Sequence, residues 1–200
     1  MHDIKLVIFD LGNVLINHDA EIFLKDFMQV SGKDRQSVVD IFKNAYSGKF
    51  DTGQSSARDF YNNIIKGLEV KLSFQDFKNI YCNIFKEHSD FKPFVYQIME
   101  NFNTSILSNI DELHHNYIIN NWPWVLDIKD WFVSYKMGMV KPDINIYNEV
   151  LNKMGFKAQE TVFIDDREDN IQGAKKAGLN AVHFSDTENA VNELNKLGLL

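Results

Sequence analysis

The chain is poor in cysteine, because Cys82 stands alone among 200 residues. A single cysteine excludes an internal disulfide framework and fits a protein of a reducing compartment. Cys82 lies among aromatic and aliphatic residues that include Phe77 and Tyr81. This setting predicts that the thiol is buried as a packing group and is not a reactive nucleophile.

The chain also lacks long hydrophobic runs and an excess of positive charge. No run approaches the length that spans a bilayer, and the amino-terminal residues do not have the pattern of a secretory signal. Lys and Arg number 21 against 28 Asp and Glu, for a net charge of −7, so a broad nucleic-acid-binding surface is not expected. We therefore expect a cytoplasmic protein, monomeric or homodimeric, that binds neither membranes nor nucleic acid.

Two short apolar runs each end abruptly in aspartate. Residues 6–9 are followed by Asp10, and residues 161–164 are followed by Asp165 and Asp166. Four β-forming residues without polar alternation are typical of a strand buried on both faces of a parallel sheet. Ligands of such sheets bind beyond the carboxyl ends of the strands. If the two strands are neighbours, the three carboxylates could hold a divalent cation and leave one carboxylate free as a nucleophile.

Further strand-like runs lie at residues 104–107, 131–133 and 181–184, and helical patterns separate the later ones. Ile144, Tyr147 and Leu151 fall on one face of a predicted helix that Gly155 can end. Strands that alternate with helices imply βα units. The sequence therefore predicts an α/β fold, with a Rossmann-like, doubly wound parallel sheet as its core.

The interval between residues 9 and 104 is far longer than the dozen or so residues that one crossover connection needs. It contains helical patterns at 20–30, 35–46, 57–68 and 73–88, in which apolar residues such as Phe60, Ile64 and Leu68 recur at helical spacing. We expect residues 16–91 to form a helical insert over the crevice, and residues 1–15 and 92–200 to form the core.

Polar side chains also follow other predicted strands. Ser108 and Asn109 come directly after the run at 104–107, and Lys141 precedes Pro142. Taken singly, each group has a structural explanation: the aspartates, Ser108 and Asn109 could cap loops or helices, and Lys141 could be a solvated loop residue. Taken together, they all lie at strand ends or just beyond, on the side where ligand crevices form.

These motifs together resemble the haloacid dehalogenase superfamily, whose members are mostly phosphatases with an aspartyl nucleophile, and the resemblance covers essentially the whole chain. It implies that Asp10 is the nucleophile and that the insert is the cap domain of the family. The residues it assigns to substrate are Ser108, Asn109 and Lys141, with Ser108 and Lys141 also catalytic. The residues it assigns to Mg²⁺ are Asp10, Gly12 through its main-chain carbonyl, Asp165 and Asp166.

The expected chemistry also follows from the residue types. A phosphate monoester dianion repels a carboxylate nucleophile, so positive charge must lie between them. Mg²⁺ prefers oxygen ligands and commonly joins carboxylates to a substrate phosphate, and Lys141 would add a point charge. Asp10 could then attack in line, and water would hydrolyse the resulting aspartyl-phosphate.

One position departs from the family pattern. The phosphatases of the family usually carry a general acid two residues after the nucleophile, where this chain has Gly12. A positioned acid or base typically contributes about 10²–10⁴-fold to the rate, so its loss predicts slower turnover, an activated leaving group or a substitute donor. The candidates for a substitute in the insert are His18, Asp19 and Asp51.

The string Asp-Leu-Gly-Asn-Val at residues 10–14 is similar to a subgroup that includes α-D-glucose-1-phosphate phosphatases, which suggests a sugar phosphate or a similar small metabolite as substrate. Two alternatives stay open. The chain could be a 2-haloacid dehalogenase, because a halide leaves without a proton. It could also be a noncatalytic module that binds Mg²⁺ and a phosphoryl ligand and signals to a partner.

Overall fold

The structure is a computed structural model that describes residues 3–46 and 48–200. Its centre is a sheet of parallel strands in the order β5-β4-β1-β6-β7. The strands are β1 (Leu6–Phe9), β4 (Asn103–Ser108), β5 (Asp130–Val133), β6 (Thr161–Asp165) and β7 (Asn180–His183). This sheet confirms the predicted α/β fold, and it places β1 between β4 and β6, at the point where the strand order reverses.

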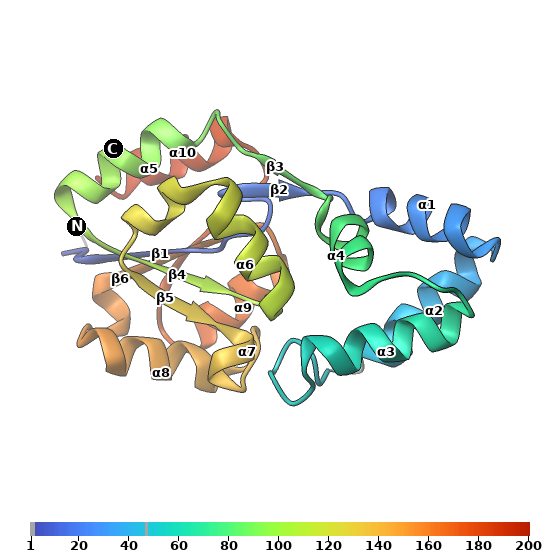
Figure 1. The fold of residues 1–200 in the computed structure, drawn as a ribbon. Coiled ribbons are helices and arrows are strands. Elements are labelled where there is room, and N and C mark those ends of the chain that lie inside the picture. The colour runs from blue at the N-terminus through green and yellow to red at the C-terminus, as the bar shows by residue number, and fades with distance from the viewer. Residues whose placement is uncertain (1–2, 47) are drawn as a thin grey trace.

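Helices cover both faces of the sheet (Figure 1). One face carries α5 (Lys92–Asn101), α6 (Glu112–Asn121) and α10 (Thr187–Lys196), and the other carries α8 (Ile144–Met154) and α9 (Glu168–Lys176). Successive residues of β1 point to opposite faces: Val7 and Phe9 pack in the first layer, whereas Leu6 and Ile8 pack in the second. The unbroken apolar run of β1 is therefore explained by burial on both sides. Short helical segments at α7 (Ser134–Met137), Pro123–Asp127 and Ala158–Glu160 complete this part.

A second, purely helical group of elements lies to one side of the sheet (Figure 1). It comprises α1 (Ala20–Ser31), α2 (Arg35–Tyr46), α3 (Ala57–Leu68) and α4 (Phe74–Cys82), and we call it the helical insert. The insert has a hydrophobic core of its own, in which aromatic rings such as Phe27, Phe42, Phe60 and Phe77 are buried. Cys82 is buried in the same cluster, as predicted, and burial raises the pKa of its thiol to about 12.

The connection between the core and the insert differs from the sequence prediction. The helix expected over residues 73–88 ends at Cys82, and Phe85–Glu87 form strand β3, which pairs antiparallel with β2 (Ile16–His18). The extended chain at β2 leaves the core with unpaired backbone groups, and β3 satisfies them. The boundaries at residues 15/16 and 91/92 stay a prediction, and residues 1 and 2 of the expected core lie outside the described residues. None of the described helices is long and apolar enough to cross a membrane.

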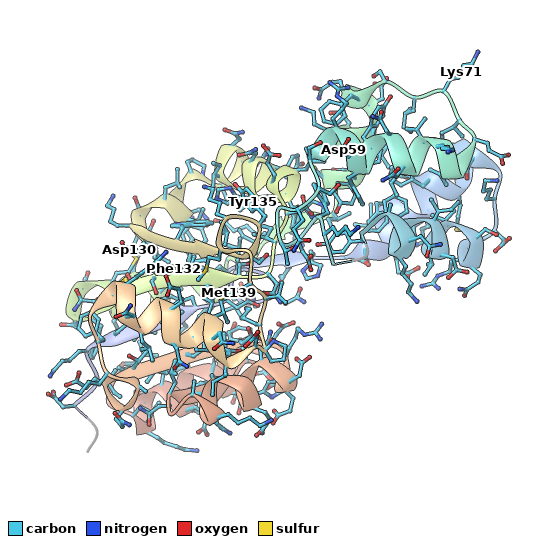
Figure 2. All side chains as sticks on the ribbon, turned by 90° about the horizontal axis from the view of Figure 1, so that it is seen from below. Asp59, Lys71, Asp130, Phe132, Tyr135 and Met139 are labelled. Carbon is cyan, nitrogen blue, oxygen red and sulfur yellow. The ribbon has the colours of Figure 1, made fainter. Side chains whose placement is uncertain are left out.

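A loop of the insert touches the core at Gly53. The backbone of Gly53 has a left-handed conformation, with φ +71°, and a Cβ atom there would lie 2.0 Å from the main-chain oxygen of Tyr135. Tyr135 belongs to α7, on the side of the core that faces the insert (Figure 2). Only a residue without a side chain permits this approach, so Gly53 fixes how closely the insert and the core meet.

Replacement of Gly53 by alanine should therefore loosen this contact. Gly32 is a matched control, because its φ is +68° and a Cβ atom there would meet no atom within 4 Å. We expect Gly32→Ala to lower the free energy of unfolding by about 1 kcal/mol, through backbone strain alone. Gly53→Ala should lower it by more, because the loop must also move away from Tyr135. Urea unfolding of both variants measures the difference, and equal losses would show that the contact contributes nothing.

Candidate active site

Asp10 stands directly after β1 and is almost fully buried, with 6% of its surface exposed. Its amide donates a hydrogen bond to the Ile164 carbonyl of β6 at 2.8 Å, which carries the sheet register one residue past the strand. The carboxylate oxygen Oδ1 accepts from the amide of Leu11 at 2.7 Å and lies 2.8 Å from the ammonium of Lys141. The other oxygen, Oδ2, has no hydrogen-bond partner among the described residues and is the oxygen free to react.

Lys141 is not a solvated loop residue but a buried one, with 4% of its surface exposed. Its ammonium lies between Asp10 and Asp165, 2.6 Å from the latter, and also donates to the Leu107 carbonyl at the end of β4, at 2.9 Å. Burial works to lower the pKa of Lys141, but the two carboxylates together raise it above its ordinary value. The side chain is therefore a fixed positive charge at the carboxyl ends of β1, β4 and β6.

Asp165, the last residue of β6, is fully buried, and both oxygens of its carboxylate accept hydrogen bonds. Besides Lys141, it accepts from the amide of Arg167 at 2.8 Å and from Nδ2 of Asn170, which lies 3.0 Å from both oxygens. Asn170 is buried in the first turn of α9, and its contact with Asp165 is a feature that the sequence analysis missed. The available signal was the spacing of five residues between Asp165 and Asn170. At this spacing the first turn of the following helix lies close to the end of the strand, so its side chains can reach Asp165.

Asp166 is more open than Asp165. Its carboxylate accepts a hydrogen bond from Nδ2 of Asn13 at 2.9 Å, and Oδ1 of Asn13 accepts from the amide of His18 at 3.2 Å. Asn13 has the left-handed conformation, with φ +54°, which asparagine adopts more readily than most residues. This single side chain thus joins the turn after β1 to Asp166 on one side and to β2 on the other.

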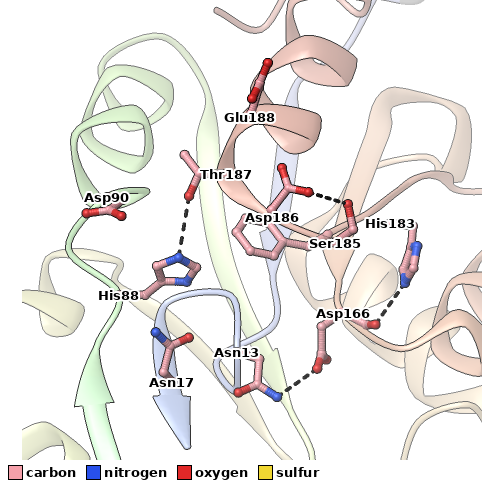
Figure 3. A pocket seen from close by; sticks show the side chains of 11 residues that line it. Asn13, Asn17, His88, Asp90, Asp166, His183, Ser185, Asp186, Thr187 and Glu188 are labelled. Atoms are coloured by element: carbon pink, nitrogen blue, oxygen red, sulfur yellow. Dashed lines mark hydrogen bonds between the residues drawn. The ribbon is translucent and has the colours of Figure 1, made fainter.

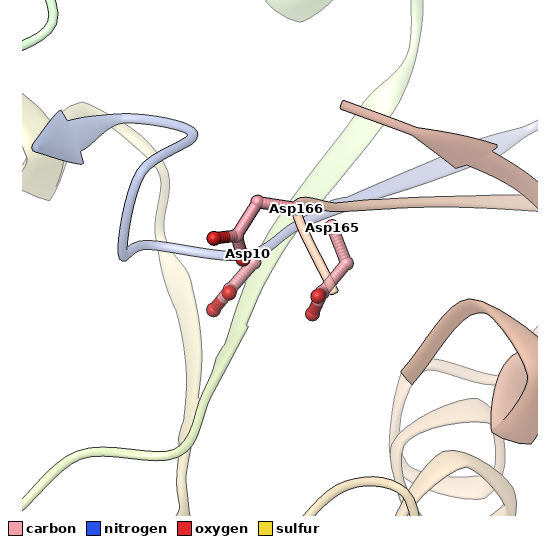
Figure 4. A group of neighbouring side chains, drawn as sticks. All are labelled: Asp10, Asp165 and Asp166. Atoms are coloured by element: carbon pink, nitrogen blue, oxygen red, sulfur yellow. The ribbon is translucent and has the colours of Figure 1, made fainter. Parts of the chain in front are cut away.

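One carboxylate oxygen of each of Asp10, Asp165 and Asp166 lies within 4.8 Å of the other two. Figure 4 shows the three side chains together. Such a group of hard oxygen ligands fits a divalent cation. Without a cation, burial raises the pKa of Asp10 to about 7, and Asp165 adds to the increase while Lys141 opposes it. The site therefore holds negative charge that both Lys141 and a bound cation would offset.

Ser108 is the last residue of β4 and Asn109 follows it. Neither caps the next helix, because Asp111 is the residue that caps α6. Ser108 is buried beside Lys141 at the end of the strand. The side chain of Asn109 exchanges two hydrogen bonds of 2.8 Å with the main chain of Lys141. Its polar atoms are thus used to hold the lysine loop, and its expected contact with a substrate stays a prediction.

A cavity of about 490 Å³ opens onto this group of side chains. Asp10, Ser108 and Lys141 line it from the core, whereas Phe23 and Tyr46 line it from the insert. His18 lines it from β2, and burial lowers the pKa of its imidazole, although Asp166 opposes that effect. The cavity therefore joins a charged floor to a partly aromatic wall.

A second, more open cavity of about 700 Å³ shares Asn13 and Asp166 with the first (Figure 3). It is lined by His88, His183 and several acidic residues, and His183 contacts the main-chain oxygen of Asp166 at 2.9 Å. Asp10, Ser108 and Lys141 do not line it. The smaller cavity, not the larger one, is therefore the candidate active site.

Comparison with known proteins decides the family. Residues 4–178 match the family model described as haloacid dehalogenase-like hydrolase. The chain belongs to this family. The predicted family membership and the prediction of an enzyme of the hydrolase class are therefore confirmed.

Among curated relatives of this haloacid dehalogenase-like hydrolase, sesquiterpene phosphatase astK from Aspergillus oryzae is 25% identical over 96% of both chains. D-ribitol-5-phosphate phosphatase from Bacteroides thetaiotaomicron is 21% identical over 88% of this chain and 89% of the relative. Drimenol cyclase drtB from Aspergillus calidoustus is 24% identical over 97% of this chain, but the match spans only 36% of the length of drtB.

A crystal structure of a family enzyme from Bacteroides thetaiotaomicron has the same fold, with a TM-score of 0.83, 24% identity, and coverage of 90% of this chain and 93% of that one. That crystal contains magnesium and inorganic phosphate. The cluster of Asp10, Asp165 and Asp166 could bind such a metal ion, which agrees with the predicted magnesium cofactor.

Magnesium should stabilise the folded protein through Asp166. Ligand at 100 times its dissociation constant stabilises by about 2.7 kcal/mol, so Mg²⁺ should raise the melting temperature of the wild type above its value in chelator. Asp166→Asn should lose most of this increase. Asp169→Asn, which removes the same charge from an exposed ion pair with Arg167, should keep it. Equal increases in all three proteins would place the cation elsewhere.

Proposed function

We propose that this protein is a Mg²⁺-dependent phosphatase that hydrolyses a small phosphate monoester through an aspartyl-phosphate intermediate. The observation that carries the proposal is the position of Lys141, 2.8 Å from the nucleophile candidate Asp10, beside an acidic cluster in one cavity. Two relatives of similar length are named as phosphatases, which supports phosphate esters as the substrate class.

The proposed chemistry assigns a distinct task to each side chain. Asp10 attacks phosphorus with its free oxygen Oδ2, while Lys141 holds Oδ1 and offsets the charge of the phosphoryl group. Ser108, at the end of β4, binds a phosphoryl oxygen. The proposed metal ligands are Asp10, Asp165, Asp166 and the Gly12 carbonyl, and the metal would supply further positive charge to the phosphoryl group when bound. Asp165, engaged by Lys141 and Asn170, keeps the lysine in place.

The physiological substrate is a narrower proposal. The two phosphatase relatives are named for a sesquiterpene and for a sugar-alcohol phosphate, and the cavity offers both aromatic and polar walls. We propose a small phosphorylated metabolite, with sugar phosphates as the first class to screen. The cytoplasmic location and the monomeric or homodimeric state stay predictions.

The proposal is tested by phosphate release from 4-nitrophenyl phosphate with and without Mg²⁺. We expect release to require Mg²⁺ and to fall by at least about 10³-fold in Asp10→Asn, because the amide is no nucleophile. Asp130→Asn is the control, since Asp130 is exposed at the first residue of β5 (Figure 2), whereas the candidate active site lies at the carboxyl ends of the parallel strands. An Asp10→Asn variant as active as the wild type would refute the aspartyl-phosphate mechanism.

Carbon attack on a 2-haloacid is the competing reaction, and Gly12 favours it because a halide needs no acid. The acidic cluster opposes it, since additional carboxylates would repel a haloacid anion. We expect no halide release from 2-chloropropionate in the presence of chelator. Measurable release that Asp10→Asn abolishes would favour the dehalogenase instead.

A further inference from the structure

The turn after Asp10 places His18 at the active-site cavity. The main chain of His18 is fixed by the hydrogen bond from its amide to Oδ1 of Asn13, at 3.2 Å, and its ring lies 6.2 Å from that of Phe85 on the paired strand β3. His18 lines the same cavity as Asp10, Ser108 and Lys141. The described residues offer its imidazole no hydrogen-bond partner, so the ring nitrogens are available to a ligand.

The imidazole of His18 lies beside Gly12. A Cβ atom on Gly12 would lie 3.3 Å from Cε1 and 3.4 Å from Nδ1 of His18. The 3.3 Å contact is tighter than most packing contacts, so a side chain at position 12 would press on the His18 ring, which would have to shift by a few tenths of an ångström. The ring therefore lies in contact with the position where a side chain two residues after Asp10 would begin.

Two other residues of the cavity that could carry a proton, His114 and Asp169, are already engaged. Both nitrogens of His114 face acceptors, with Nδ1 2.9 Å from the Asp111 carboxylate and Nε2 3.1 Å from the Tyr81 carbonyl. Asp169 forms an exposed ion pair with Arg167.

The phenol of Tyr46 is a poor proton donor, because burial, with help from nearby carboxylates, raises its pKa. The two other candidates from the sequence, Asp19 and Asp51, do not line this cavity. Asp19 instead caps α1 by accepting from the amide of Glu21 at 2.9 Å. Among the described residues that line the cavity, His18 is thus a proton carrier whose ring makes no hydrogen bond to the protein.

We propose that His18 is the general acid and base of the phosphatase, in the space that Gly12 leaves open; this inference rests on the proposed function. As Asp10 bonds to phosphorus and the ester P–O bond breaks, the imidazolium of His18 gives its proton to the departing oxygen. The neutral imidazole then takes a proton from the water that attacks phosphorus. That second attack breaks the bond between phosphorus and Asp10, and it leaves inorganic phosphate and a reprotonated His18.

The experiment compares His18→Gln with the wild type on phenyl phosphate and on 4-nitrophenyl phosphate. Nitrophenolate leaves without a proton, whereas phenolate is a far more basic leaving group. We expect kcat/KM to fall at least about 10²-fold more on phenyl phosphate than on 4-nitrophenyl phosphate. With 4-nitrophenyl phosphate the variant should release a burst of nitrophenolate equal to the enzyme, because the aspartyl-phosphate forms but loses its base for hydrolysis.

A second pair of variants tests the shared space. Gly12→Asp alone should be impaired, because its side chain meets the His18 ring. In His18→Ala the space is empty, and Gly12→Asp in that background should regain about tenfold or more of the activity on phenyl phosphate. His88→Gln is the matched control, since His88 lines the other cavity, and melting temperatures verify that each variant is folded.

The outcomes separate the two proposals. Equal losses of His18→Gln on both esters without a burst, no loss at all, or no gain from Gly12→Asp in His18→Ala would overturn the role of His18. In each of these cases the wild type remains an Mg²⁺-dependent phosphatase. A wild type that releases phosphate from neither ester would instead overturn the proposed function itself.

Discussion

The ammonium of Lys141 between the buried carboxylates of Asp10 and Asp165 is the interaction on which the site depends. Two carboxylates this close and this buried would repel each other and favour protonation. Lys141 offsets that repulsion, and its bond to the Leu107 carbonyl ties the charge to a third strand end. Removal of one partner from a buried ion pair typically costs about 3–5 kcal/mol. The contacts of Lys141 therefore stabilise the ends of β1, β4 and β6, and they also hold Asp10 in position.

The molecule has two hydrophobic cores, and each belongs to a part that contributes differently to the site. The parallel sheet and its helices hold the reacting groups, and their positions follow from strand ends. The insert, with its own aromatic core, supplies the opposite wall of the cavity through Phe23 and Tyr46. Substrate choice and chemistry can therefore vary independently, because the wall and the charged floor belong to two different hydrophobic cores.

Much of this arrangement could be predicted from the sequence, because apolar runs and the polar residues that end them are local patterns. The parallel sheet, the burial of Cys82 and the meeting of Asp10 with Asp165 followed from such patterns. The pairing of β2 with β3 could not be predicted, since residues 85–87 continue a helical pattern and their partner lies far away in the chain. The hydrogen bonds of Asn13 and Asn170 were missed for a related reason: an asparagine near a turn or a helix start already has a sufficient local explanation.

The contact of Tyr81 with Asp111 has a consequence for motion. The phenol of Tyr81, on α4 of the insert, donates to the fully buried carboxylate of Asp111 on the core at 2.9 Å, and its ring stacks on His114 with 4.1 Å between ring centroids. If the insert swung outward, this carboxylate would have to exchange a charge-assisted bond for water in the middle of an aromatic surface. Any outward swing of the insert would therefore have to break this buried contact, together with that of His114 with the Tyr81 carbonyl.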